Sequence, residues 1–263
     1  MRLITMMRIS GKSPSTVGCR STTGSLGSGR ISTSLVRSVA RGDDQVIVSV
    51  ADSKFNGSWP IEEGNVTITH LNAKGVKWPI GKLLQTTSID YHNGVFMHAF
   101  LGPGDYHRQH APVSGKVIEV KNIQDQVYLQ VDTKNGHLTG DRRLVRDPHM
   151  VSKHSQLKGD KSFYDLDAPD DAGYQWCQAR GLVVIETEKY GKVAILPIGM
   201  AQVSSVVITV QEGQYVNKGD NISYFQFGGS DVVLVFEKKV AFKPGLEPGK
   251  TKLNVRQEIA TFL

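Results

Sequence analysis

The sequence contains little cysteine and no long apolar run. Cys19 and Cys177 are the only cysteines among 263 residues, and they form no CxxC pattern. Neither a zinc site nor a disulfide framework is indicated, so we expect no metal and a reducing compartment. No stretch of about 18 apolar residues occurs, and we therefore expect no membrane span. Basic runs with interleaved aromatic residues are also missing, so we expect no nucleic-acid partner.

Residues 1–42 lack acidic side chains altogether. Seven basic residues stand there among many Ser, Thr and Gly residues, while Asp and Glu begin only at Asp43. So little apolar surface cannot offset the entropy cost of ordering, and we expect most of this tail to be disordered. The same composition is typical of mitochondrial transit peptides, and the alternative is a dispensable tail.

The chain as a whole has the composition of a soluble globular protein. Hydrophobic residues make up 39% and charged residues 21%, which lets residues 43–263 form a single domain with a substantial core. The formal net charge of +6 favours anionic partners such as lipid headgroups. The oligomeric state is left open, and a dimer is compatible with these features.

Short apolar segments with many β-branched residues recur along the chain. They predict strands at 46–50, 66–69, 94–101, 116–120, 127–131, 182–187, 192–196, 203–210 and 232–236. Only residues 79–85 resemble a short helix, and the polar section 132–173 is expected to be a functional or disordered connection. The fold class is therefore mainly β or α+β, with an antiparallel, barrel-like sheet and a few short helices.

Two glycine-containing turns add detail to this fold. The pattern G-x-x-V-x-x-G at 213–219 resembles the hairpins of lipoyl-like barrels, and so does the segment 111–117. In such hairpins the turn glycine adopts a positive φ, which a β-carbon would penalise. We therefore expect lipoyl-like hairpins within the sheet.

The stretch from Tyr224 to Glu237 places a Gly-Gly-Ser step between two apolar segments. Gly228 and Gly229 carry no β-carbons, so the backbone can bend there and another group can approach closely. A plain turn between two core strands is the alternative. A serine hydroxyl is a weak nucleophile at neutral pH and needs a base, commonly a histidine oriented by a carboxylate. Asp52 and either His107 or His110 could provide this pair for Ser230.

Three segments together are similar to the pyruvoyl-dependent phosphatidylserine decarboxylase family. They are Val-Ala-Asp-Ser at 50–53, Tyr-His-Arg-Gln-His-Ala-Pro at 106–112 and Gly-Gly-Ser at 228–230. The resemblance covers about residues 45–240. It implies that the chain is a zymogen that cuts itself between Gly229 and Ser230, with residue 230 becoming a pyruvoyl group.

The resemblance also implies roles for individual residues. His110, Asp52 and Ser230 would carry out self-cleavage, whereas His107 would serve as the proton donor in substrate decarboxylation. Arg108 and Met200 are tentative substrate-binding residues, and Arg108 could also pair with Asp105 or another carboxylate. A pyruvoyl ketone can bind a substrate amine and act as an electron sink when CO2 departs.

Two departures from the family pattern affect the expected substrate. Asp231 follows the serine, where it could disfavour a developing oxyanion or simply point outward from the strand. The Ala-Asp-Ser form, together with the segment 199–205, looks closer to the soluble branch that includes tryptophan decarboxylases. The favoured reaction is conversion of phosphatidylserine to phosphatidylethanolamine. The alternatives are decarboxylation of a free aromatic amino acid and an unprocessed, non-catalytic lipoyl-like binding module.

Location follows the substrate. A phospholipid substrate implies peripheral contact with a membrane, whereas a free amino acid needs none. The protein is therefore expected in the cytoplasm or at a membrane surface, with mitochondrial targeting by residues 1–42 as a further option.

Overall fold

The computed structural model describes 11 segments of the chain, which carry all the structural statements below. They are residues 42–68, 76–102, 105–124, 130–134, 137–141, 143–145, 165–167, 174–176, 178–199, 206–226 and 230–263. The expected disordered tail, apart from Gly42, and the tentative substrate residue Met200 lie outside these segments, as do Gly228 and Gly229.

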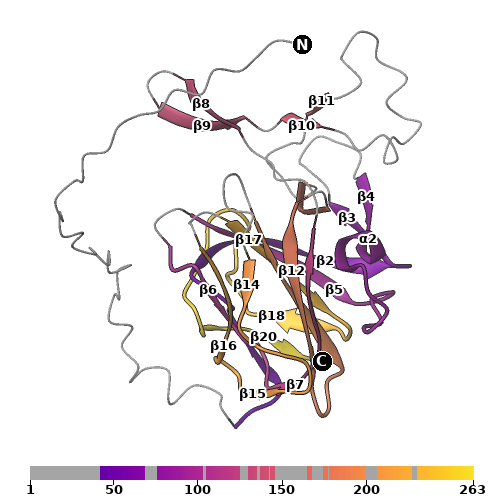
Figure 1. The fold of residues 1–263 in the computed structure, drawn as a ribbon. Coiled ribbons are helices and arrows are strands. Elements are labelled where there is room, and N and C mark those ends of the chain that lie inside the picture. The colour runs from indigo at the N-terminus through magenta and orange to yellow at the C-terminus, as the bar shows by residue number, and fades with distance from the viewer. Residues whose placement is uncertain are drawn as a thin grey trace, which may run out of the picture.

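One large sheet dominates the fold (Figure 1). Its strands follow the order β15-β7-β12-β13-β17-β5-β2-β3-β4, and β19 pairs with β2. Their bounds are β2 Ser53–Glu62, β3 Asn65–Ile68, β4 Val76–Pro79, β5 Val95–Leu101, β7 Gly115–Ile123, β12 Arg180–Glu186, β13 Lys192–Ile198, β15 Tyr215–Val216, β17 Ser230–Phe236 and β19 Lys252–Leu253. Every pairing is antiparallel, so neighbouring strands can be joined by short hairpins.

Smaller sheets complete the strand inventory. The two three-stranded sheets have the orders β1-β20-β18 and β14-β16-β6, and the remaining strands form the pairs β8-β9 and β10-β11. Their bounds are β1 Val46–Val48, β6 Arg108–His110, β8 Gln130–Lys134, β9 His137–Asp141, β10 Arg143–Val145, β11 Asp165–Asp167, β14 Val206–Ile208, β16 Asn221–Phe225, β18 Val240–Phe242 and β20 Glu258–Phe262. The helical elements described are α2, Ile80–Leu84, and the 3-10 helix η3, Tyr174–Trp176.

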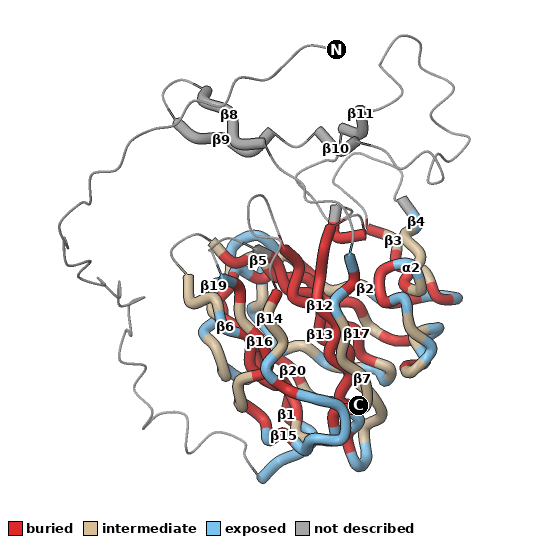
Figure 2. Tube along the Cα trace, viewed as in Figure 1, coloured by how far each residue is buried: buried red, intermediate tan, exposed pale blue. Residues whose placement is uncertain are grey.

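The central strands are buried on both faces (Figure 2). Alternate residues of β17 enter two different apolar cores: Val232 and Leu234 pack in the first, and Val233 and Val235 in the second. This explains the continuous apolar run in the sequence, because a strand covered on both sides has no solvent-facing positions. The first core also contains residues of the β1-β20-β18 sheet, and the second lies against α2 and η3.

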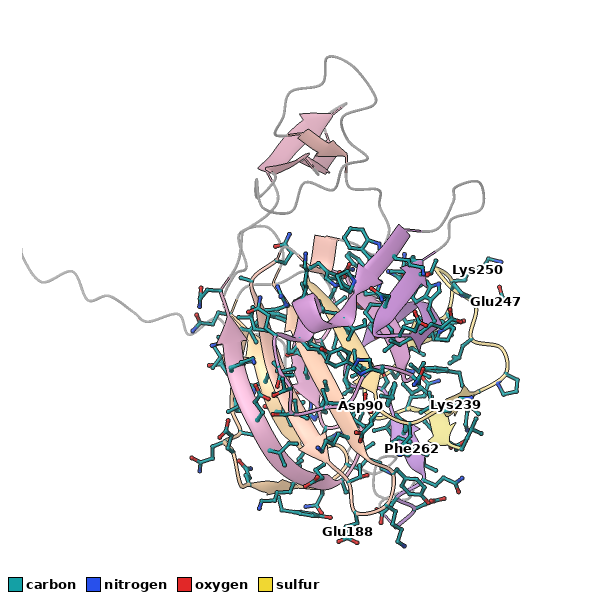
Figure 3. The ribbon with its side chains drawn as sticks, turned by 90° about the vertical axis from the view of Figure 1, so that its right-hand side faces the viewer. Asp90, Glu188, Lys239, Glu247, Lys250 and Phe262 are labelled. Atoms are coloured by element: carbon teal, nitrogen blue, oxygen red, sulfur yellow. The ribbon has the colours of Figure 1, made fainter. Side chains whose placement is uncertain are left out.

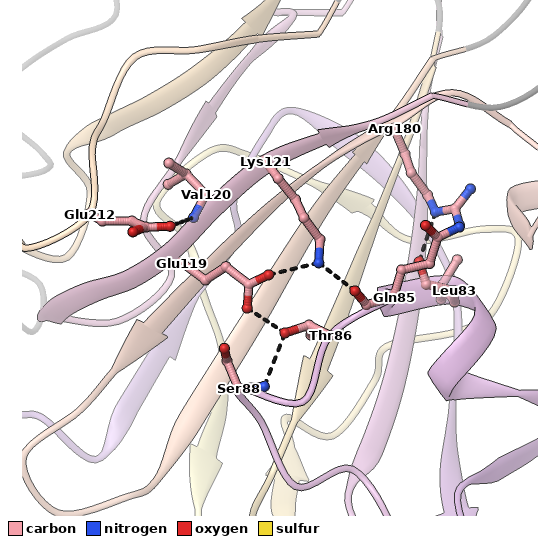
Figure 4. Close-up of polar contacts among 9 residues, drawn as sticks. All are labelled: Leu83, Gln85, Thr86, Ser88, Glu119, Val120, Lys121, Arg180 and Glu212. Atoms are coloured by element: carbon pink, nitrogen blue, oxygen red, sulfur yellow. Dashed lines mark hydrogen bonds and ion pairs between the residues drawn. The ribbon is translucent and has the colours of Figure 1, made fainter.

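Helix α2 is tied to the sheet through its carbonyl end (Figure 4). The buried Arg180 guanidinium donates to the Leu83 carbonyl at 2.8 Å and to the Lys82 carbonyl at 3.0 Å. Lys121 of β7 donates to the Gln85 carbonyl and pairs with Glu119 at 2.7 Å. The last carbonyls of a helix have no hydrogen-bond donor within the helix, so these two cations supply donors to carbonyls that would otherwise lack one.

The glycine-containing turns form as expected, but for two different reasons. Gly213 and Gly219 have φ values of +85° and +86°, as the lipoyl-like pattern predicts. Gly115 instead begins β7 beside the end of β12: a β-carbon there would be 2.2 Å from the Glu186 carbonyl oxygen. The first pair needs the left-handed conformation, whereas Gly115 needs the space.

The expected mainly β fold is confirmed, with several differences in detail. The sheet is not a closed barrel, since β15 and β4 end the strand order in the described part of the chain. The section 132–173 contains parts or all of strands β8 to β11 and is not simply a connection. The ten-residue β2 was missed, because Gly57 and Pro60 interrupt a largely polar sequence.

The sequence analysis also did not predict the C-terminal strands β18, β19 and β20. The segment between β18 and β19 is exposed, and Figure 3 shows Glu247 and Lys250 at its outer edge. These two side chains form an ion pair at 2.9 Å with solvent on both sides, which contributes little to stability. In the described residues, no helix is long and apolar enough to cross a membrane.

Candidate active site

Three neighbouring strands end at the candidate site. Ser230 begins β17, and its Cα lies opposite that of Leu101, the last residue of β5. On the other side of β5, Lys54 pairs with Phe100, so the start of β2 lies at this same end of the sheet. Asp52 immediately precedes β2. The sheet therefore brings the predicted nucleophile and the predicted carboxylate to the same end of these strands, although they are 178 positions apart (230 − 52).

Asp52 is held by a long-range contact and not by a local turn. Its Oδ1 accepts the backbone N–H of Val255 at 2.7 Å. The side chain is half-buried, and the adjacent Ser53 is buried with its hydroxyl near the Ala51 carbonyl. The Asp52 carboxylate thus connects the start of β2 to the segment that follows β19.

His110 lies in β6, which is joined to the loop before Asp52. The His110 backbone N–H donates to the Val50 carbonyl at 2.7 Å. The side chain is 4% exposed and packs against the Tyr106 ring, with the ring centroids 5.7 Å apart. Burial lowers the pKa of His110 from 6.5 to about 4, so the ring is neutral near pH 7.

The hydrogen bonds of His110 define which nitrogen carries the proton. Nδ1 lies 2.8 Å from the Gly219 carbonyl, which can only accept, so Nδ1 is protonated. Nε2 is then the basic nitrogen, and it accepts from the Tyr106 hydroxyl at 3.2 Å. Burial is the main cause that raises the pKa of Tyr106, and this keeps the phenol protonated as a donor. The site thus holds a neutral histidine with its base nitrogen facing another polar group.

The predicted partners Asp52 and His110 make their hydrogen bonds elsewhere. The Gly219 carbonyl occupies the orienting position at His110 Nδ1, while Asp52 accepts from Val255. For these two described side chains, the direct carboxylate–imidazole contact of a Ser-His-Asp triad is not formed. The triad roles of Asp52, His110 and Ser230 remain predictions.

His107 has a different environment from His110, as expected for positions three apart in an extended segment. Its Nε2 donates to the Gly102 carbonyl at 3.0 Å, directly after the end of β5. The ring also contacts Phe225 edge-on, with centroids 6.4 Å apart. His107 therefore lies at the same end of the strands as Asp52 and Ser230. The contact that places it there does not involve His110.

The basic side chains of the site have separate partners. Arg108 is exposed and lies over the Tyr224 ring at 5.0 Å, whereas Asp105 pairs with Lys252 at 3.0 Å. The suggested Arg108–Asp105 pair is thus replaced by two other contacts. Arg256 donates to the Gly219 carbonyl at 2.9 Å and its charge helps lower the pKa of His110. Lys252 and Arg256 were missed in the sequence because they carry no motif and follow the matched segments.

Asp231 does not point outward, as one alternative had allowed. Its side chain is completely buried and approaches His98 in the second core. Val232, the next residue, packs in the first core. Asp231 therefore lies on the opposite face of β17 from Val232, among residues that the motif analysis had not connected with the site.

The first residue of β17, the Asp52 carboxylate and the His107 ring thus lie at the same end of three neighbouring strands. A sequence model described as phosphatidylserine decarboxylase matches residues 30–261. The chain belongs to the phosphatidylserine decarboxylase family, which confirms the resemblance noted in the sequence.

Individual relatives give the same family and a second substrate type. The chain is 29% identical to a phosphatidylserine decarboxylase proenzyme of Fusobacterium nucleatum, over 81% of this chain and 60% of the relative. It is 28% identical to phosphatidylserine decarboxylase proenzyme 3 of Schizosaccharomyces pombe, over 74% of this chain and 16% of the relative. An L-tryptophan decarboxylase of Psilocybe cubensis is also 28% identical, over 70% of this chain and 38% of the relative. The chain thus spans less than two thirds of the length of each.

Proposed function

We propose that this protein is a pyruvoyl-dependent phosphatidylserine decarboxylase, made as a zymogen and activated by cleavage between Gly229 and Ser230. The observation that carries the proposal is the position of Ser230. It is the first residue of a central strand and lies at the same end of the sheet's strands as Asp52 and His107. Family membership supports the decarboxylase class, because the relatives include proenzymes named for this activity.

In the proposed self-cleavage, the Ser230 hydroxyl oxygen bonds to the Gly229 carbonyl carbon and the peptide C–N bond breaks. This leaves an ester and a free amine at residue 230. A base then removes the α-proton of residue 230 and its Cβ–Oγ bond breaks, which frees the Gly229 carboxylate and leaves dehydroalanine. The imine tautomer of this residue takes up water and releases ammonia, which leaves the pyruvoyl ketone. His110 is assigned as the base, because its neutral Nε2 can take the Ser230 proton after exchanging its contact with Tyr106.

A pyruvoyl group at position 230 would supply an electron sink for loss of CO2 from an amine-bearing substrate. The start of β17 suits this group, because the strand is paired on both sides and would hold the new chain end in place. His107 is the residue assigned to hold the proton for the α-carbon. Its Nε2 contact with Gly102 fixes the ring at the end of β5, beside the first residue of β17.

The charge near the site is compatible with an anionic substrate. Lys252 and Arg108 are exposed, and the hydrogen bond with Asp105 is the main cause that raises the pKa of Lys252, which keeps it cationic. A phosphodiester or a carboxylate could bind to such groups. For phosphatidylserine, the proposal includes peripheral contact with a membrane, where basic residues add attraction to anionic lipid.

The second candidate is decarboxylation of a free aromatic amino acid, favoured by the relatives named L-tryptophan decarboxylase. The deciding assay is CO2 release from phosphatidylserine in mixed micelles, run beside release from free tryptophan. Turnover of phosphatidylserine with no turnover of tryptophan is expected. The reverse result, together with failure to float with vesicles, would assign the second candidate.

Self-cleavage is tested separately from the substrate. Denaturing electrophoresis and intact mass should reveal two chains, and Ser230→Ala should give only one. An uncut parent chain with an unmodified Ser230 would contradict the zymogen proposal and favour a non-catalytic binding module.

A further inference from the structure

A buried polar cluster lies on the other face of the strand that begins at Ser230. The side chains of Asp231, His98 and Gln175 are 0%, 2% and 0% exposed. Asp231 Oδ2 lies 3.1 Å from His98 Nε2 and 3.2 Å from Gln175 Nε2. Asn56 faces His98 Nδ1 at 3.4 Å. We call Asp231, His98 and Gln175 the Asp231 cluster.

The cluster is assembled from separate elements inside an apolar core. Asp231 belongs to β17, His98 to β5 and Gln175 to η3. Val233 and Phe96, two positions from Asp231 and His98 along their strands, are buried residues of the second core. A carboxylate in such surroundings is costly unless it is hydrogen-bonded, so Asp231 depends on its contacts with His98 and Gln175 to remain in this core.

Strand alternation relates this cluster to the reaction. Residues of β17 alternate between the two cores, and Asp231 shares the second core's face with Val233. Position 230 has the opposite parity, which it shares with Val232 and Leu234. Self-cleavage at Gly229–Ser230 places negative charge on the Gly229 carbonyl oxygen, one residue from Ser230. A carboxylate that swung toward this peptide bond would oppose that charge.

We propose that His98 and Gln175 are positioning residues for self-cleavage. They hold the Asp231 carboxylate on the second-core face of β17 and so fix the residue that follows the nucleophile. This inference rests on the proposed self-cleaving function. It also explains how this chain accommodates an acidic residue directly after the serine.

The test compares His98→Leu, which removes the imidazole contact with Asp231, with His98→Gln, whose amide nitrogen can take the place of the imidazole Nε2 beside Asp231. His98→Leu should slow self-cleavage about tenfold or more, whereas His98→Gln should stay within about threefold of the parent. Asp231→Asn should cleave at least as fast as the parent, because it removes the charge that has to be held. His98→Leu with Asp231→Asn should recover the rate lost in His98→Leu.

Stability is measured separately, by urea unfolding of the same variants in a Ser230→Ala background. A cluster that only stabilises the fold would give cleavage rates that follow unfolding free energy, without a recovery specific to the loss of charge. The matched control is His92→Leu, an exposed histidine that pairs with Asp90 and should cleave normally. If His98→Leu does not fold, Gln175→Leu removes the other donor and should give the same slowing.

The outcomes distinguish the two levels of the proposal. A parent chain that cleaves, alongside a His98→Leu variant that cleaves at the same rate, would overturn the inference alone. Slow cleavage in Asp231→Asn, or no recovery in the double variant, would also overturn it. A parent chain that remains uncut would overturn the proposed function and this inference with it.

Discussion

His110 illustrates how a residue's surroundings determine its chemistry. An ordinary histidine is partly protonated near neutral pH, but burial lowers the pKa of His110 to about 4. The Gly219 carbonyl then selects the tautomer with Nε2 as the base. The motif indicated His110 as a candidate base. Its burial and its carbonyl contact depend on β16 and the turn before it, where Gly219 lies 109 positions further along the chain.

This pKa makes stability depend on pH in a defined direction. Between pH 6.5 and about 4 the unfolded chain binds a proton at His110 that the folded chain does not. The stability contributed by neutral His110 is therefore complete above pH 6.5 and is lost as pH falls toward 4, by about 3 kcal/mol. Urea unfolding of the Ser230→Ala chain at pH 7 and pH 4.5 should detect this loss. With His110→Gln added, that part of the pH dependence should disappear; an unchanged difference would argue against a depressed pKa.

The motifs predicted residue types better than residue partners. Short patterns identified Asp52, His107 and Ser230, and the structure brings these three positions to the same end of neighbouring strands. Their actual partners, such as Val255 for Asp52, have no recognisable signal because a backbone N–H is present in almost every residue. The Asp231 cluster was missed for a similar reason: His98 has no motif, and its role depends on pairing between distant strands.

At the scale of elements, sequence periodicity worked where burial was uniform. The strand predicted at 192–196 is β13, and the strand predicted at 232–236 lies within β17. Both are apolar along their length because both faces are covered. β2 escaped prediction because it is buried unevenly and contains a glycine and a proline. Its place in the sheet is determined by pairing with β5, which a local pattern cannot reveal.

Two glycines should respond differently to the same substitution. Gly115→Ala should destabilise the fold by about 1–3 kcal/mol, because the new β-carbon would collide with the Glu186 carbonyl between β7 and β12. Gly213→Ala has open space but a φ of +85°, so its cost should be about 1–2 kcal/mol and purely conformational. Urea unfolding in the Ser230→Ala background measures both.

Gly42→Ala is the matched control for these substitutions, since Gly42 has open space and no positive φ. Its free energy of unfolding should change by less than about 0.5 kcal/mol. If Gly115→Ala were as mild as this control, β7 and β12 would have to separate more easily than their pairing suggests.

At the scale of the whole molecule, the proposed cleavage site lies at one end of a central strand of the large sheet. On one side β17 pairs with β5 through seven residue pairs, and on the other side it pairs with β13 through six. Cutting before Ser230 would leave a small chain of residues 230–263, that is 34 residues (263 − 229). This chain includes β18, β19 and β20, which pair with β1, β2 and each other.

The two chains should therefore remain together in native conditions. Size-exclusion chromatography of the cleaved protein should give one peak that contains both chains, and only denaturant should separate them. The parent and the uncut Ser230→Ala protein should elute at the same volume, because cleavage leaves the sheet in place. Release of the small chain without denaturant would contradict the central position of β17.

For the proposed self-cleavage, the central position of β17 also imposes an order of events. The strand must find its two neighbours before its first residue can meet the groups that act on it, so folding has to precede cutting. After the cut, unfolding would turn an intramolecular search into an encounter between two separate chains, whose success depends on concentration. The lifetime of the proposed cleaved protein would then depend on its rate of unfolding, because an unfolding event would be difficult to reverse.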